Sequence, residues 1–187
     1  MKISKVNSKR EVLIQQHTLL CSTPVMKNKV LEKTMVLITR HSMFGSTGII
    51  LNSPMELSVQ ITDMQSGKIP LSFGGPDDEL LSFLVSIPSL PDGLRTSTYW
   101  SRNRSDLKVL MNFISSEEVY LKAYKGCLSW MPGELEEEIK NGQWWATNEY
   151  HSDDLFDTEK DFWSKTARKI SGHFAPLINA DIPVFYN

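Results

Sequence analysis

The sequence has little of what several large functional classes require. Its two cysteines, Cys21 and Cys127, lie far apart in the 187 residues and form no paired spacing, so a disulfide framework is not expected. No stretch approaches the roughly 20 apolar residues that cross a bilayer, and the first ten residues lack the apolar run of a signal peptide. We therefore predict a cytoplasmic protein with reduced thiols and no membrane segment.

Motifs for metals and nucleotides are also missing. The four histidines show no H-x-x-H or H-E-x-x-H spacing, and neither cysteine lies near a histidine in the sequence. No G-x-x-x-x-G-K-[ST] or G-x-G-x-x-G string occurs. We accordingly predict no metal, no cofactor and no catalytic residues, while ligands that are distant in sequence stay open.

Charge is unevenly distributed along the chain. Residues 1–50 hold eight Lys or Arg and two Asp or Glu, whereas the remainder holds 12 and 20, for a net charge of −2 overall. The positive residues are scattered and form no run, unlike the basic stripe of a nucleic-acid-binding protein. Attraction between the basic first 50 residues and the acidic remainder of the chain explains the asymmetry more simply. We therefore expect no direct nucleic-acid binding.

Size and composition favour one globular domain. With 41% hydrophobic and 22% charged residues, the chain can bury a substantial core. We predict an N-terminal arm over residues 1–16, a core over 17–172 and a C-terminal tail over 173–187. No repeat or linker divides it.

The most informative stretch runs from Val119 to Thr147. Alternating apolar and polar residues from Val119 to Tyr124 predict a strand, which a glycine-rich turn follows. Pro132 suits a helix start, the glutamates after it suit the positive end of the helix dipole, and Asn141-Gly142 suits a left-handed stop. An aromatic strand with Trp144 and Trp145 on opposite faces should follow, one in the core and the other exposed or covered by the last helix.

Other elements follow from shorter patterns. The apolar run Thr34–Thr39 predicts a strand buried on both faces, and residues 40–48 predict a loop that closes a hairpin. Residues 55–70 are weakly patterned and predict loop. We further expect strands at 18–21, 49–51 and 80–87, a turn or short helix at 28–29, a helix at 105–113, and a last helix opened by Asp157-Thr158 and ended by Gly172.

Several strings occur in an order typical of one family, and together they cover roughly residues 17–172. They are Thr34-Met35-Val36-Leu37, His41, Gly45-Ser46-Thr47-Gly48, Gly48-Ile49-Ile50-Leu51-Asn52-Ser53-Pro54, Gly74-Gly75-Pro76, Gly126 through Trp130 to Glu136, Trp144, Leu155-Phe156 and Trp163. In this combination the chain resembles the AlgH/YqgE family of small bacterial proteins. The resemblance implies an α+β fold with a mixed sheet, partly rolled into a small barrel and surrounded by helices. It also implies a transcriptional-regulatory role, with no catalytic mechanism attached.

The chain departs from the family pattern at several polar positions. The opening glycine of the family is His17 here, and an arginine is Lys33. The Asn-Arg/Lys-Pro motif contains Ser53, a histidine corresponds to Ser86, and the Gly-Tyr-Ala-Gly-Trp string contains Ser129. We hypothesise a divergent member, in which a family function that depends on these groups is in doubt.

Each residue that could take part in binding or catalysis also has a purely structural explanation. Gly74-Gly75-Pro76 either presents amides to an anion or forms a tight turn against a packed strand; we favour the turn, because phosphate loops normally lead into a helix. Cys127 is interpreted as a small buried hydrophobe and not as a nucleophile. The glutamates at 134 and 136–138 are interpreted as a solvated helix face.

The resulting hypothesis is a non-enzymatic binding or regulatory protein with a ligand cleft between three loops. The cleft would take an unknown protein or small molecule, and the oligomeric state is open. The alternative is an enzyme, or a nucleotide- or anion-binding protein, that uses the Gly74-Gly75-Pro76 turn; DNA binding through the basic first quarter ranks last. The residues predicted to line the cleft are His41, Gly45, Gly48, Asn52, Gly74, Gly75, Pro76, Trp130, Pro132, Gly133 and Glu134.

Overall fold

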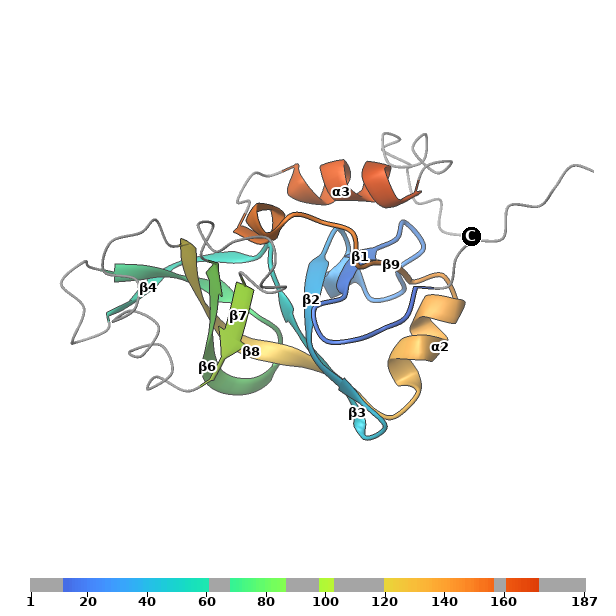
Figure 1. The fold of residues 1–187 in the computed structure, drawn as a ribbon, viewed down its shortest axis with the longest axis horizontal. Helices are drawn as coiled ribbons and strands as arrows, with labels where there is room; N and C mark the ends of the chain where they lie inside the picture. Colours follow the sequence, from blue (N-terminus) through green and yellow to red (C-terminus); the bar gives the residue numbers. More distant parts are fainter. Residues whose placement is uncertain (1–11, 61–67, 87–97, 103–119, 157–160, 172–187) are drawn as a thin grey trace, which may run out of the picture.

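The computed structural model describes residues 12–60, 68–86, 98–102, 120–156 and 161–171. They form a mixed nine-stranded sheet with helices beside it, which confirms the α+β class (Figure 1). The strands are β1 (Leu19–Ser22), β2 (Met35–Ser42), β3 (Gly45–Ile50), β4 (Pro54–Gln60), β5 (Lys68–Phe73), β6 (Asp77–Ser86), β7 (Thr98–Ser101), β8 (Tyr120–Trp130) and β9 (Trp144–Thr147). The helices are η1 (Lys29–Leu31), α2 (Glu134–Lys140), η2 (Ser152–Phe156) and α3 (Phe162–Ser171).

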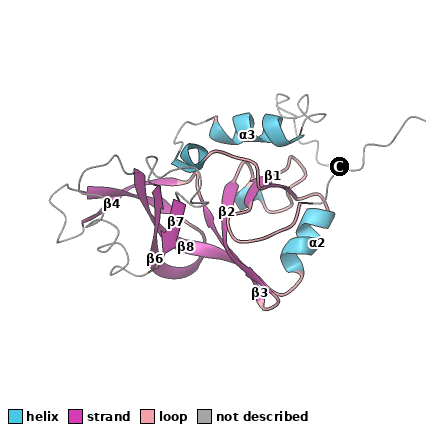
Figure 2. Ribbon diagram, in the orientation of Figure 1, coloured by secondary structure: helices cyan, strands magenta, loops and turns pink. Residues whose placement is uncertain are grey.

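Strand β8 joins the part of the sheet that contains β4 to β7 to the part that contains β1 to β3 and β9. The strand order is β4-β5-β8-β3-β2-β1-β9, and β6 pairs with both β7 and β8. Figure 2 shows β8 running from the side of β6 and β7 toward β3. The first part of β8 pairs with β6 and, in parallel, with β5, whereas Leu128 to Trp130 pairs with β3. Between these parts Gly126 adopts a φ of 80°, a backbone conformation that glycine tolerates best. The predicted strand at 119–124 therefore continues to Trp130, and no turn interrupts it.

Strand β2 confirms the prediction of burial on both faces. Met35 and Leu37 belong to one hydrophobic cluster, together with Phe162 and Trp163 of α3. Val36 and Ile38 point to the opposite face, in a second cluster with Trp130, Leu135 of α2 and Trp144. A continuous apolar run is required here because each face of the strand has its own cover.

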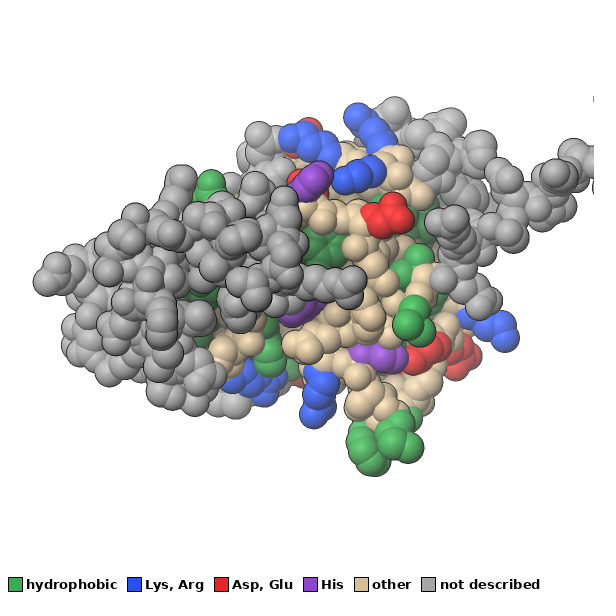
Figure 3. Space-filling view, in the orientation of Figure 1, with side chains coloured by type: hydrophobic (Ala, Val, Ile, Leu, Met, Phe, Trp, Pro, Cys, Tyr) green, Lys and Arg blue, Asp and Glu red, His purple; other side chains and the backbone are tan. Residues whose placement is uncertain are grey.

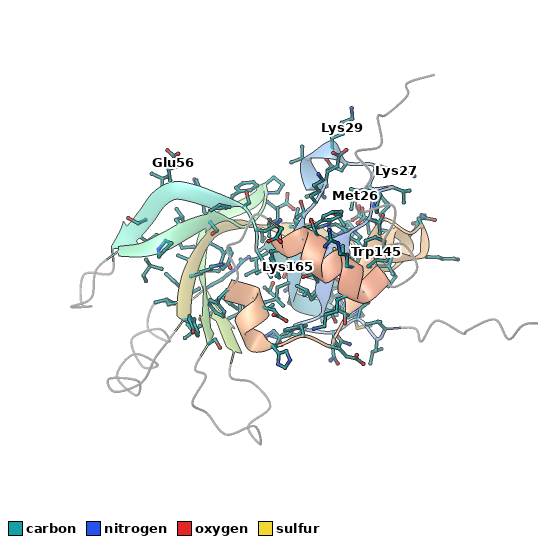
Figure 4. All side chains as sticks on the ribbon, turned by 90° about the horizontal axis from the view of Figure 1, so that it is seen from above. Met26, Lys27, Lys29, Glu56, Trp145 and Lys165 are labelled. Carbon is teal, nitrogen blue, oxygen red and sulfur yellow. The ribbon has the colours of Figure 1, made fainter. Side chains whose placement is uncertain are left out.

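The segment after β8 also agrees with its sequence signals. Helix α2 begins with three glutamates in its first turn and buries Leu135. Asn141 caps its end, and Gly142 follows with a φ of 75°. Trp144 is 2% exposed, while Trp145 lies on the other face and packs with Trp163 of α3. Figure 4 shows Trp145 beside α3 when the molecule is viewed from above.

Two further expectations about loops were wrong, and one about the shape of the sheet is not confirmed. Residues 40–48 form no loop, because β2 extends to Ser42 and β3 begins at Gly45, which leaves Met43-Phe44 as the turn. Within the 55–70 segment, strands β4 and β5 pair with each other, and β5 also pairs with β8 from far along the chain. The barrel-rolled sheet is not confirmed, since the strand order of the described residues runs open from β4 to β9.

Some expectations fall outside the described residues. They are the helix at 105–113, the start of the last helix at Asp157-Thr158, residues 1–11 of the arm, and the tail at 173–187. No helix in the described part of the chain is long and apolar enough to cross a membrane.

Candidate functional site

The turn of the β2–β3 hairpin lies directly against the end of β8. Ser46 pairs with Trp130, and a Cβ atom added at Gly45 would lie 2.3 Å from the backbone oxygen of Trp130. Gly45 also has a φ of 114°, so a side chain there would be strained as well as obstructed. The structure thus brings His41 and Gly45 together with the segment Trp130–Glu134, as the sequence hypothesis requires.

His41 links the hairpin to helix α2. Its Nδ1 lies 2.8 Å from Ser46 Oγ, and its Nε2 lies 3.6 Å from Glu136 Oε1. Nε2 faces the carboxylate, and Nδ1 and the serine hydroxyl face each other at hydrogen-bond distance, with the tautomer of the ring setting which of them donates. The side chain of His41 is 21% exposed. Both ring nitrogens are thereby engaged in contacts that hold the hairpin, which makes His41 a structural link.

Pro132, Gly133 and Glu134 form the turn into α2. Gly133 is the N-cap residue with a φ of 81°, so Pro132 precedes the helix and does not open it. The carboxylate of Glu134 accepts a hydrogen bond of 2.8 Å from the backbone N–H of Met131. Glu134 therefore fixes the turn that leads into the helix, and its negative charge suits the positive end of the helix dipole.

Glu138 is the clearest exception to the solvated-face interpretation. Its Oε2 accepts one hydrogen bond from Trp130 Nε1 at 2.8 Å and another from Trp144 Nε1 at 2.7 Å. The two indole rings meet edge to face, with centroids 6.3 Å apart. One carboxylate thus fastens α2 to the ends of both β8 and β9.

Gly74 and Gly75 pack against the backbone of β8. A Cβ atom at Gly74 would lie 2.3 Å from Gly126 O, and one at Gly75 would lie 2.2 Å from Cys127 O. The Gly74 N–H donates to Lys125 O at 2.7 Å, and the Gly74 carbonyl accepts from the Ile50 N–H at 2.9 Å. The interpretation of a tight turn crossing a packed strand is confirmed.

The remaining predicted residues lie elsewhere. Gly48 faces the interior of the hairpin, where an added Cβ would meet Val36 Cγ1 at 2.6 Å. Exposed Pro76 follows the glycine turn. Asn52 lies beyond the opposite end of β3, where its Oδ1 accepts from Met35 N and its Nδ2 donates to Lys33 O, both at 2.8 Å. Of the residues predicted to line a cleft, those in the hairpin turn and at the start of α2 lie together, whereas the glycine contact lies separately, further along β8.

Both cysteines are buried, which for Cys127 agrees with the sequence interpretation. Cys21 is fully buried, and burial raises the pKa of its thiol. Cys127 is 3% exposed, accepts from Arg102 Nη2 at 3.5 Å and lies 3.9 Å from Ser129 Oγ. No group of three or more metal-ligating side chains occurs within the described ranges.

Sequence reasoning missed the apolar character of the hairpin turn. Met43 is 82% exposed, Phe44 81% and the nearby Met131 73%. Figure 3 shows hydrophobic side chains projecting where the β2–β3 hairpin ends, with histidine and acidic side chains beside them. Two large apolar residues in a hairpin turn are a signal that the sequence already carried, because such turns usually hold Gly, Asn or Asp.

Comparison with known proteins identifies the family. The sequence profile described as AlgH-like, DUF179, matches residues 19–175. The chain belongs to the AlgH-like family. A UPF0301 protein of Chlorobium phaeobacteroides is 26% identical over 115 residues, which is 59% of this chain and 62% of that protein. A UPF0301 protein of Pelodictyon phaeoclathratiforme is 28% identical over 115 residues, 59% of this chain and 61% of that protein. The matched stretch thus spans about six-tenths of these relatives.

Two solved structures share the fold. Protein DIP2367 of Corynebacterium diphtheriae superposes with a TM-score of 0.66 at 20% identity, covering 90% of this chain and 93% of that one. The AlgH protein of Pseudomonas aeruginosa superposes with a TM-score of 0.62 at 19% identity, covering 99% of this chain and 100% of that one. Identity this low establishes the architecture alone.

Proposed function

We propose that this AlgH-like chain is a non-enzymatic cytoplasmic binding protein that contacts a protein partner through the hairpin-end surface. That surface consists of Met43, Phe44 and Met131, with the acidic first turn of α2 beside it. The observation that carries the proposal is the exposure of these three side chains, at 82%, 81% and 73%, on a rigidly held hairpin. Large apolar side chains gathered at one place on a surface mark interaction sites, whereas singly scattered ones do not.

The polar groups around the surface support binding over chemistry. His41, Ser46 and Glu136 connect the hairpin to α2, and Glu134 holds the backbone of Met131 in the turn before the helix. Each contact fixes a backbone position and holds the apolar side chains in place. Preorganisation of this kind raises affinity, because little ordering entropy is lost on binding.

The partner is expected to offer an apolar socket with a basic rim. Glu134, Glu136 and Glu137 are exposed in the first turn of α2 and give the neighbourhood negative charge. Burying one phenylalanine and two methionines contributes about 1.5–3 kcal/mol each before the costs of association. Such a contribution suits a reversible regulatory contact in the micromolar range. The regulatory role that the family resemblance implies would then act through a protein and not through DNA.

The alternative, a nucleotide or anion site at Gly74-Gly75-Pro76, has weaker support. The Gly74 amide already donates to Lys125 O, and the space that a ligand would need is filled by the β8 backbone. No second function is proposed there.

A photo-crosslinking experiment tests the proposal. A benzophenone amino acid is placed at Phe44 and, as the control, at Val30, which is 78% exposed on η1. We expect a defined protein to be captured from cells of the source organism at position 44 and not at 30. Phe44→Ser should then weaken binding of the purified partner at least about tenfold, as loss of an apolar hot spot does, while Val30→Ser leaves it unchanged. Equal capture at both positions, or none at 44, would refute the proposal.

A further inference from the structure

The hairpin-end surface holds both of the exposed methionines in the described part of the chain. Met43, in the β2–β3 turn, is 82% exposed, and Met131, directly after β8, is 73% exposed. By contrast, Met26 and Met35 are 8% and 0% exposed and pack in the hydrophobic clusters, and Met55 is half-buried. A dissolved oxidant therefore reaches the thioether sulfur at the hairpin end far more readily than in the core.

The two exposed methionines belong to one place on the molecule. A Cβ atom added at Gly45 would lie 3.4 Å from the backbone carbonyl carbon of Met131, so the segment after β8 lies against the turn that carries Met43 and Phe44. Apolar side chains project from this end of the hairpin in Figure 3. A chemical change at either sulfur thus alters the same surface that is proposed to bind a partner.

Methionine sulfur reacts with peroxides by a two-electron oxidation that cells can reverse. A sulfur lone pair attacks one peroxide oxygen, the S–O bond forms as the O–O bond breaks, and the second oxygen leaves as water with the proton of the first. The product is a polar, chiral sulfoxide. In the reverse reaction, two thiols supply two electrons and two protons and become a disulfide, and the sulfoxide oxygen leaves as water.

We propose that Met43 and Met131 form a reversible oxidation site at which peroxide weakens the binding of a partner to the hairpin-end surface. The inference rests on the proposed function, because it names the regulation of that same surface. A sulfoxide oxygen that enters an apolar socket loses its water without gaining a donor, which costs free energy. The neighbouring carboxylates of Glu134, Glu136 and Glu137 cannot compensate, because ionised carboxylates only accept hydrogen bonds.

Peptide mapping by mass spectrometry tests the modification without any partner. Folded protein is treated with hydrogen peroxide for increasing times, and sulfoxide is measured at each methionine. We expect Met43 and Met131 to be oxidised at least about tenfold faster than Met26 and Met35, because a buried sulfur reacts only when the fold opens. The melting temperature should not change as these two residues react, since both are exposed.

Reversal is measured in the same samples. A mixture of the two stereospecific methionine sulfoxide reductases, supplied with dithiothreitol, should return Met43 and Met131 to the thioether. Equal oxidation rates at the exposed and buried methionines, or sulfoxides that the reductases leave in place, overturn the proposal.

The partner captured at Phe44 tests the effect on binding. Peroxide-treated wild type should bind this partner at least about tenfold more weakly than untreated protein, and reductase treatment should restore the affinity. The double variant Met43→Leu/Met131→Leu keeps two apolar side chains without sulfur, so its affinity, whatever the starting value, should be the same before and after peroxide. An equal loss in the double variant would assign the effect to other residues and overturn the proposal.

The outcomes separate this inference from the proposed function. Equal affinity of treated and untreated wild type for a captured partner overturns the control by oxidation and leaves the proposed function intact. Failure to capture any partner at Phe44 refutes the proposed function and, with it, the control of binding.

Discussion

Removing the Glu138 carboxylate should cost more stability than any other change among the glutamates of α2. In Glu138→Ala, the indoles of Trp130 and Trp144 lose their shared acceptor, although they are only 7% and 2% exposed. A buried donor left unpaired costs about 1–3 kcal/mol. Glu138 is itself half-buried, so water can replace part of what is lost. We therefore expect a decrease of about 2–4 kcal/mol in the free energy of unfolding.

Urea denaturation followed by circular dichroism measures this change. Glu138→Gln keeps an acceptor oxygen without the charge and should lose about half as much, because hydrogen bonds to charged groups are roughly twice as strong as neutral ones. The neighbouring exposed Glu137 is the matched control, and Glu137→Ala should fall within about 0.5 kcal/mol of wild type. If Glu138→Ala unfolds at the same urea concentration as Glu137→Ala, the two indole contacts contribute nothing and the reasoning is refuted.

Three further predictions concern the backbone, a side-chain bridge and pH. Gly75→Ala, whose Cβ would lie 2.2 Å from a β8 carbonyl oxygen, should cost more than about 3 kcal/mol, whereas Gly142→Ala meets no neighbouring atom and should cost about 1–2 kcal/mol of backbone strain; thermal unfolding compares them. Asn52→Asp keeps the acceptor but loses the donor of its bridge, and should cost about 1–2 kcal/mol in urea unfolding; unchanged stability would contradict this. Burial raises the pKa of Tyr150 to about 12, so between about pH 10 and 12 the folded state keeps a proton that the unfolded state releases, and stability falls as pH rises. Tyr150→Phe should flatten that fall in melting temperature, and an unchanged slope would count against it.

Local sequence patterns predicted the elements whose form depends on burial on every face or on local backbone preference. The apolar run in β2 requires cover on both faces, and the structure provides it. The stop of α2 at Asn141-Gly142 follows from local backbone preference. Strand β4 was missed although Met55, Leu57 and Val59 alternate with polar residues, which is the period of a half-buried strand. Strand β5 was missed because pairing with β4 and with distant β8 creates it.

Only part of the candidate site could be predicted from the sequence. The cleft hypothesis placed His41, Gly45 and the Trp130–Glu134 segment in one group, and β3–β8 pairing brings them together. The role of Glu138 could not be derived from a run of glutamates, because it depends on where two tryptophans from different strands arrive.

The position of β1 has a consequence for synthesis of the protein. One side of β1 pairs with β2 almost immediately, but its other side pairs with β9, and Thr18 bonds Asn148 across 130 positions of the chain. At about 5–20 residues per second, a ribosome needs roughly 6–25 s to supply that partner. During this interval the nascent chain carries an open apolar strand edge, a natural target for chaperones and for aggregation.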